Sequence, residues 1–275
     1  YYVHSGCFSH KMALQELYCK KSDYLSKEFI GNLNNEAMKQ IDEIYSLDKL
    51  VLDHTMYPQY ARFIPLAEKK EALYHLGHDS CDAHHLFPVL PRNDGERYLR
   101  YCPLCVKDDR ETYGEAYWHR KHQIRNMSIC TKHKCRLMET CVLAKSEQCF
   151  TLCPAENYIS NDEAVFVNDP MVIHYAEYLD MVFDAPMEFE NDIPISSILY
   201  DGMSRTKYLK PSGRSRYTKM FADDMGEFYG SMGICSVASV YQIQRILLGS
   251  LSEFSAICQI AFFLGMKPEE LTASS

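Results

Sequence analysis

The sequence contains no hydrophobic run long enough to cross a membrane. Its longest strongly apolar stretch, residues 256–266, includes Gln259 and is far shorter than the roughly 20 residues that a spanning helix needs. The first residues, Tyr-Tyr-Val-His-Ser-Gly, have neither the basic start nor the apolar core of a secretion signal. We therefore expect a cytosolic protein that makes no contact with a membrane.

Glycine and proline are also scarce, with 12 and 11 residues in a chain of 275. This excludes a fibrous or low-complexity protein. Hydrophobic residues make up 47% of the chain and charged residues 24%, so the chain can bury real cores. Its length suits two or three small domains better than one.

Motifs of common enzyme classes are missing as well. The sequence has no Gly-x4-Gly-Lys-Ser/Thr loop that would cradle a nucleotide phosphate. It also has no evident Ser-His-Asp or paired-carboxylate arrangement. We predict that the protein is not an enzyme. The alternative from another class is a zinc-dependent hydrolase, in which Glu115, His119 and His122 surround a catalytic ion.

Positive charge is unevenly distributed, although the net charge is -8. Residues 92–136 carry eleven Lys or Arg against six Asp or Glu, and residues 202–220 contain basic residues but no acid. Attraction of phosphates depends on local basic patches of this kind more than on the net charge of the chain. The alternative is a solvated surface loop with no nucleic-acid partner. The candidate DNA contacts in the second stretch are Arg205, Lys207, Lys210, Arg214, Arg216 and Lys219, followed in the first stretch by Arg120, Lys121 and Arg125.

Cysteine is abundant, with 12 residues, of which eight lie between Cys81 and Cys153. Clustered cysteines in a reducing compartment bind metal more often than they form disulfides. The pairs Cys102-x2-Cys105 and Cys130-x2-His133 offer three thiolates and one imidazole, which predicts a structural Zn²⁺ site without an open position.

Other donors compete for this role. His119 and His122 are three residues apart and could ligate a metal from a helix, although we favour packing or phosphate contacts for them. A second metal site at Cys135, Cys141, Cys149 and Cys153 lacks paired spacings, and Cys81 with His84 and His85 lacks a partner pair.

The patterning predicts a mainly α fold. Ser9 is the expected N-cap of a first helix, and helical periodicity marks residues 34–52, 68–76, 172–179, 221–229, 237–248 and 253–264. We divide the chain into an N-terminal helical, helix-turn-helix-like region (1–90) and a central CCCH zinc-finger module (91–145). A helical connector (146–200) and a C-terminal helical, helix-turn-helix-like domain (201–275) follow.

Three segments, residues 100–109, 113–123 and 130–137, closely resemble the TniQ/TnsD family of target-selection proteins from bacterial transposons. Residues 53–63 resemble the TnsD branch, and residues 221–230 and 262–270 resemble the C-terminal helical part of the family. The irregular cysteines after Cys135 depart from the second cysteine-pair finger of many members, and the chain is shorter than the long TnsD-type members.

The resemblance implies a non-enzymatic, nucleoid-associated bacterial adaptor that binds double-stranded DNA and recruits an AAA+ ATPase transposition regulator. The resemblance also implies a transposase or an RNA-guided (CRISPR) complex as a further partner. Family members either read a fixed attachment sequence or dock on an RNA-guided complex. Residues 53–63 favour direct reading, whereas the modest length favours docking.

Overall fold

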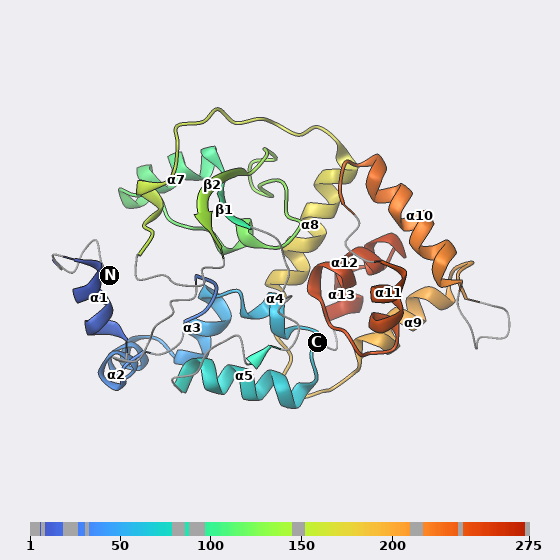
Figure 1. Ribbon diagram of the computed structural model, residues 1–275, viewed down its shortest axis with the longest axis horizontal. Helices are drawn as coiled ribbons and strands as arrows, with labels where there is room; N and C mark the ends of the chain where they lie inside the picture. The colour runs from blue at the N-terminus through green and yellow to red at the C-terminus, as the bar shows by residue number, and fades with distance from the viewer. Residues whose placement is uncertain are drawn as a thin grey trace. The chain divides into compact units, whose positions relative to one another are not determined.

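The computed structural model describes residues 6, 9–18, 27–30, 33–78, 86–87, 97–144, 152–209, 217–235 and 239–272. Helices dominate this part of the chain, and the sheet found in it has two strands (Figure 1). The prediction of a mainly α fold is therefore confirmed. The chain forms two compact units, each built from segments that are separate in the sequence.

Unit 1 comprises Tyr1–Tyr57, Lys70–Gln123 and Ser128–Phe166, and unit 2 comprises Pro58–Lys69, Ile124–Met127 and Val167–Ser275. Both units therefore draw on the first half of the chain as well as on later segments. The four-part division expected from the sequence stays a prediction.

Short capped helices open the chain. Ser9 caps α1 (His10–Leu17) as predicted, because its side chain accepts the N–H of Met12 at 3.3 Å. The single period expected over 34–52 forms two helices instead, α2 (Asn35–Ile44) and α3 (Leu47–His54). Tyr45 is extended between them, and the Asp42 carboxylate accepts the N–H of Leu47 at 3.2 Å. Local side-chain bonding thus ends the helix where the apolar period continues.

The remaining elements of the first half are short apart from α5 (Leu66–His78), which follows α4 (Tyr57–Ala61). In unit 1, β1 (Tyr98–Tyr101) pairs antiparallel with β2 (Met138–Leu143), with Arg100 opposite Glu139. Between the strands lie α7 (Pro103–Tyr113) and the 3-10 turn η1 (Arg120–Gln123), and η2 (Ala155–Asn157) follows β2. The strand pair thereby brings residues near 100 beside residues near 140.

Unit 2 contains the two longest helices of the described part of the chain. These two are α8 (Pro170–Asp184) and α10 (Thr218–Ser231). The unit also contains α9 (Ile195–Ser204), α11 (Val240–Leu247), α12 (Phe254–Phe263) and α13 (Pro268–Thr272). The helices predicted around 172–179, 221–229, 237–248 and 253–264 are confirmed, although residues 237 and 238 lie outside the described part.

Helix α12 forms the centre of unit 2, because every residue from Phe254 to Ala261 is buried. The Phe262 ring packs edge-on against Tyr175 and Tyr178, at centroid distances of 5.2 and 5.3 Å. The Tyr229 hydroxyl donates to the Gln259 carbonyl at 2.8 Å. Unit 2 thus has a continuous apolar and aromatic core.

A buried arginine closes one end of α8 in unit 2. Arg62 is 1% exposed, and its Nη2 donates to the carbonyls of Phe183 at 3.2 Å and Ala185 at 2.5 Å. Burial lowers the pKa of its guanidinium to about 10, so the group remains charged at neutral pH. The cation therefore satisfies carbonyls that the helix end leaves without intrahelical partners.

Among the residues that the structure describes, no helix has the length and hydropathy required to cross a bilayer.

Candidate metal centre

The first half of the candidate site is a turn at the start of α7. Strand β1 ends at Tyr101, and Cys102 then forms the N-cap of the helix, with Pro103 in the first turn. The Cys102 Sγ accepts the backbone N–H of Cys105 at 3.4 Å. A helix N-terminus carries partial positive charge and favours a thiolate at Cys102, and the Cys-Pro-x-Cys turn presents both sulfurs on one side.

The second half is a tight turn between Cys130 and Cys135. The N–H of Cys130 donates to the Cys135 carbonyl, and the N–H of Lys134 donates to the Cys130 carbonyl, both at 2.8 Å. Lys134 has a φ of 54°, in the left-handed region that a sharp reversal requires. Isolated bridging between Ile129 and Arg136 closes the loop, which fixes Cys130 and His133 on one face.

The four predicted ligands meet in space. The ligand atoms of Cys102, Cys105, Cys130 and His133 all lie within 4.8 Å of one another. His133 Nδ1 is 3.4 Å from the sulfurs of Cys102 and Cys105 and 3.8 Å from that of Cys130, and the Cys105 and Cys130 sulfurs are 3.7 Å apart. This group can hold a metal ion.

The ionisation of these donors also favours a bound cation. Hydrogen bonds from the Cys105 and Cys130 thiols lower the pKa of the Cys102 thiol to about 2. The resulting thiolate raises the pKa of Cys105 far above its usual range. Sulfurs this close cannot all be ionised without a positive charge among them. The donor set therefore fits a divalent metal ion that all of the thiolates share.

A carboxylate supports the histidine from behind. The Nε2 of His133 lies 3.2 Å from Asp108 Oδ2, and Lys132 pairs with the same carboxylate oxygen. The hydrogen bond from Lys132 is the main reason why the pKa of Asp108 is lowered. Carboxylates in this position orient a ligating imidazole and fix its tautomer. Asp108 was missed by the sequence reasoning, although it follows Cys105 by three residues on the same helix.

A fourth sulfur lies in the cluster. Cys135 is completely buried, and its Sγ is 3.4 Å from that of Cys102. Cys135 therefore packs against the predicted ligands Cys102, Cys105, Cys130 and His133, although the prediction did not place it there. Cys141 is exposed and Cys153 is partly buried, while Cys81, His84, His85 and Cys149 lie outside the described residues.

The two competing histidines lie beside the cluster. His119 Nε2 is 2.8 Å from Asp109 Oδ2, and its ring stacks on that of His122 with centroids 4.7 Å apart. His122 is buried, burial lowers its pKa, and its Nε2 is 3.8 Å from the Cys105 sulfur. Together with Cys105, the two imidazoles form a second possible metal-binding group. Glu115, which the hydrolase hypothesis requires, belongs to no such group among the described residues.

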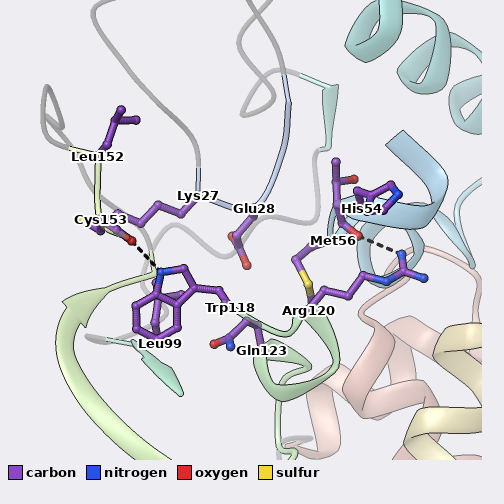
Figure 2. A pocket seen from close by; sticks show the side chains of 11 residues that line it. Lys27, Glu28, His54, Met56, Leu99, Trp118, Arg120, Gln123, Leu152 and Cys153 are labelled. Carbon is purple, nitrogen blue, oxygen red and sulfur yellow. Dashed lines mark hydrogen bonds between the residues drawn. The ribbon is translucent and has the colours of Figure 1, made fainter. Parts of the chain in front are cut away.

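Side chains of the 113–123 segment also line a small pocket of unit 1, with a volume of about 200 Å³ (Figure 2). Trp118 donates its indole N–H to the Cys153 carbonyl at 2.7 Å. Across the pocket, Arg120 donates to the carbonyls of Leu52 at 2.6 Å and Thr55 at 3.3 Å. Arg120, a candidate DNA contact, is thus engaged by backbone carbonyls.

The other candidate DNA contacts have different surroundings. Arg125 is half-buried, with its guanidinium 4.0 Å from Glu253 and over the Tyr60 ring, and Lys121 is half-buried on η1. Arg205 and Lys207 are exposed but form ion pairs with Glu270 and Asp224, each at 2.7 Å. Lys219 is exposed on α10. Lys210, Arg214 and Arg216 lie outside the described residues.

The part of the chain that resembles known proteins includes the candidate metal centre. Residues 2–137 match the family model described as TniQ, and this region contains the whole Cys/His group. Over 135 residues the chain is 29% identical to the transposon Tn7 transposition protein TnsD of Escherichia coli. The match covers 48% of this chain and 26% of that protein, so the chain spans about a quarter of the relative's length. The two comparisons together support a TniQ family member, with the family match over residues 2–137.

Proposed function

We propose that this protein is a zinc-stabilised, DNA-binding target-site selector of a bacterial transposon. It recognises the insertion site and recruits an AAA+ transposition regulator, and it catalyses no reaction itself. The observation that carries the proposal is that the TniQ match spans the Cys/His group. The similarity to a transposition protein supports a role in transposition. Its place of action is the bacterial cytoplasm, at the nucleoid.

The metal in this proposal is Zn²⁺ with a structural role. Zinc binds thiolates at about 2.3 Å and imidazole at about 2.0–2.1 Å in a tetrahedron, which places neighbouring ligand atoms about 3.5–3.8 Å apart. The separations of 3.4, 3.7 and 3.8 Å in the cluster support such a site. Cys102, Cys105, Cys130 and His133 fill all four positions, so the ion holds the fold together and leaves no place for a substrate.

DNA binding in this proposal begins with phosphate contacts from the basic stretch between residues 202 and 220. Lys219 offers an exposed ammonium, and DNA phosphates compete with Glu270 and Asp224 for Arg205 and Lys207. Lys210, Arg214 and Arg216 complete this group, with Arg120, Lys121 and Arg125 as secondary candidates. Such contacts set affinity and salt dependence, whereas base-edge contacts set the sequence preference.

The experiment that tests this proposal measures binding of the 275-residue chain to a panel of genomic duplexes in moderate salt, with and without the AAA+ ATPase. We expect one sequence to bind far better than its scrambled version, and the ATPase to join that complex. Equal affinity for target and scrambled duplexes would remove the direct-reading version and leave docking on an RNA-guided complex. Failure to bind any duplex would contradict DNA binding itself.

Charge reversal supplies the matched comparison. The double variant Arg214→Glu/Arg216→Glu should weaken binding to all duplexes and reduce the slope of log affinity against log salt by about 2. Lys39→Glu, an exposed lysine on α2, should leave both quantities unchanged. Unchanged binding in the double variant would remove these two residues from the interface.

A further inference from the structure

Helix α11 is short but fixed at both ends. At its start, the Ser239 hydroxyl accepts the N–H of Gln242 at 3.3 Å, and the Gln242 side chain accepts the N–H of Ser239 at 2.9 Å. At its end, Gly249 adopts a φ of 72°, and the N–H of Ser250 donates to the Arg245 carbonyl at 2.9 Å. A capping box and a left-handed glycine together keep these eight residues helical.

The two faces of α11 differ sharply. Ile243, Ile246 and Leu247 are buried in unit 2 and anchor the helix. The opposite face exposes Tyr241 and Leu248, which are 66% and 73% accessible, with Gln244 exposed between them. Positions 241, 244 and 248 form one stripe about 10 Å long, because a helix rises about 1.5 Å per residue.

The segment that contains this stripe has no negative charge to repel a polyanion. Residues 232–252 contain no Asp or Glu, and Arg245 is the only charged residue among them, in a chain with a net charge of -8. Helix α10 presents the opposite character, because Asp223 and Glu227 are exposed on it. Among these two helices, α11 is the one that can approach phosphates without repulsion.

Gln244 on the stripe and Arg245 beside it carry base-reading chemistry. A glutamine amide can bind adenine through two hydrogen bonds in the major groove, arginine does the same with guanine, and apolar groups contact the thymine methyl. The Arg245 guanidinium is already oriented, since it donates to the Ser250 carbonyl at 2.8 Å and lies over the Tyr241 ring at 5.9 Å. Gln244 and Arg245 both lie on the side of α11 away from the buried Ile243, Ile246 and Leu247, so one groove can contain both side chains.

We propose that α11 is the helix that enters the major groove of the target, with Gln244 and Arg245 as the residues that determine base specificity. This inference rests on the proposed function, and it identifies base contacts that the basic stretch at 202–220 does not supply. Leu248 and Tyr241 border the reading residues and exclude water from them.

The test selects preferred duplexes from a random library with the 275-residue chain and then measures affinities by fluorescence anisotropy. Gln244→Ala should lose the preference at one A·T position and bind the preferred duplex about 5- to 100-fold more weakly, with affinity for scrambled DNA unchanged. Arg245→Ala should relax a neighbouring G·C position. Gln40→Ala, the same substitution at an exposed glutamine of α2, should behave as wild type.

Other outcomes overturn the inference in distinguishable ways. If both α11 variants select the wild-type sequence with wild-type affinity, α11 does not read DNA while DNA binding itself stands. An equal loss on preferred and scrambled duplexes would make α11 a backbone contact only. Loss of ATPase binding with DNA selection intact would make it a protein-docking face. If the wild-type chain binds no duplex, the proposed function fails as well. Hydrogen exchange over 240–247 verifies that each variant keeps the helix.

Discussion

The two units bury different kinds of side chain. Around the metal centre of unit 1, the largest buried group near α7 consists of four sulfurs, those of Cys102, Cys105, Cys130 and Cys135. The clusters beside it are small, for example Leu99, Val142 and Ala144. Unit 2 instead buries eight consecutive residues of α12 among tyrosine and phenylalanine rings. In the proposed function, a zinc ion stabilises the stretch around α7, which has little apolar surface to bury, whereas unit 2 gains its stability from hydrophobic burial.

The largest effect should come from removing one metal ligand. Cys105→Ser should abolish stoichiometric metal binding and unfold residues 98–143, because structural zinc supplies apparent binding free energies of about 10–16 kcal/mol. Hydrogen exchange followed by mass spectrometry should then show lost protection at 98–113 and 138–143. Protection at 254–263 should remain.

Cys141→Ser is the matched control for that experiment, since Cys141 is exposed on β2 outside the cluster. It should retain the metal and the protection pattern. If Cys105→Ser kept the metal, or if both units lost protection equally, the contrast between a metal-held and a core-held unit would be wrong.

The reverse experiment weakens unit 2 and spares the metal. Arg62→Ala leaves the carbonyls of Phe183 and Ala185 without their buried cationic partner, so we expect a loss of about 3 kcal/mol in the free energy of unfolding of unit 2. Urea denaturation would measure this loss, and elemental analysis should find unchanged metal content. Arg205→Ala, at an exposed arginine, should change stability by well under 1 kcal/mol. A comparable loss in both variants would contradict the capping role of Arg62.

A smaller effect is expected from the carboxylate behind His133. Asp108→Asn removes the charge that orients the imidazole, which should weaken metal affinity about 10- to 100-fold without unfolding the chain at saturating metal. Competition with a chelator measures this affinity. Asp223→Asn, on the exposed surface of α10, serves as the control. Equal affinities in the two variants would show that Asp108 does not support the ligand.

The smallest effect concerns a surface ion pair of unit 1. Glu156 accepts two hydrogen bonds from Arg110, at 2.9 and 2.6 Å, and one from the N–H of Ala116. The Arg110 bond is the main reason why the pKa of Glu156 is lowered. Glu156→Gln should therefore cost under about 1 kcal/mol at neutral pH, by denaturation with metal present.

The sign of the pH dependence follows from that lowered pKa. A carboxyl with a depressed pKa in the folded state contributes stability above its unfolded pKa and loses it as pH falls through the folded value. The difference between wild type and Glu156→Gln should be constant around neutral pH. A difference that grows as pH falls would contradict this assignment.

The sequence predicted some of these features and not others, for physical reasons. Two short-range spacings identified Cys102, Cys105, Cys130 and His133 as candidate ligands, because each pair lies within one turn, and the fold brings the two turns together. Helical periodicity was sufficient for α8, α10 and α12. It failed at Tyr45, where the Asp42 side chain competes for a backbone N–H and splits the expected helix.

Charge counting was less informative than spacing. Arg120 and Arg125 belong to a basic stretch, yet Arg120 donates to carbonyls and Arg125 lies near Glu253 over Tyr60. Partners of this kind come from distant parts of the chain, so no local pattern marks them. Cys135 and Asp108 illustrate the same limit at the metal centre, because their roles depend on contacts made across two separate turns.

X-ray absorption at the zinc edge, combined with elemental analysis of the purified 275-residue chain, tests the central claim most directly. A structural metal centre predicts one zinc per chain, with three sulfur ligands at about 2.3 Å and one nitrogen ligand at about 2.0–2.1 Å. A sub-stoichiometric metal content, or a water oxygen in the coordination sphere, would contradict it.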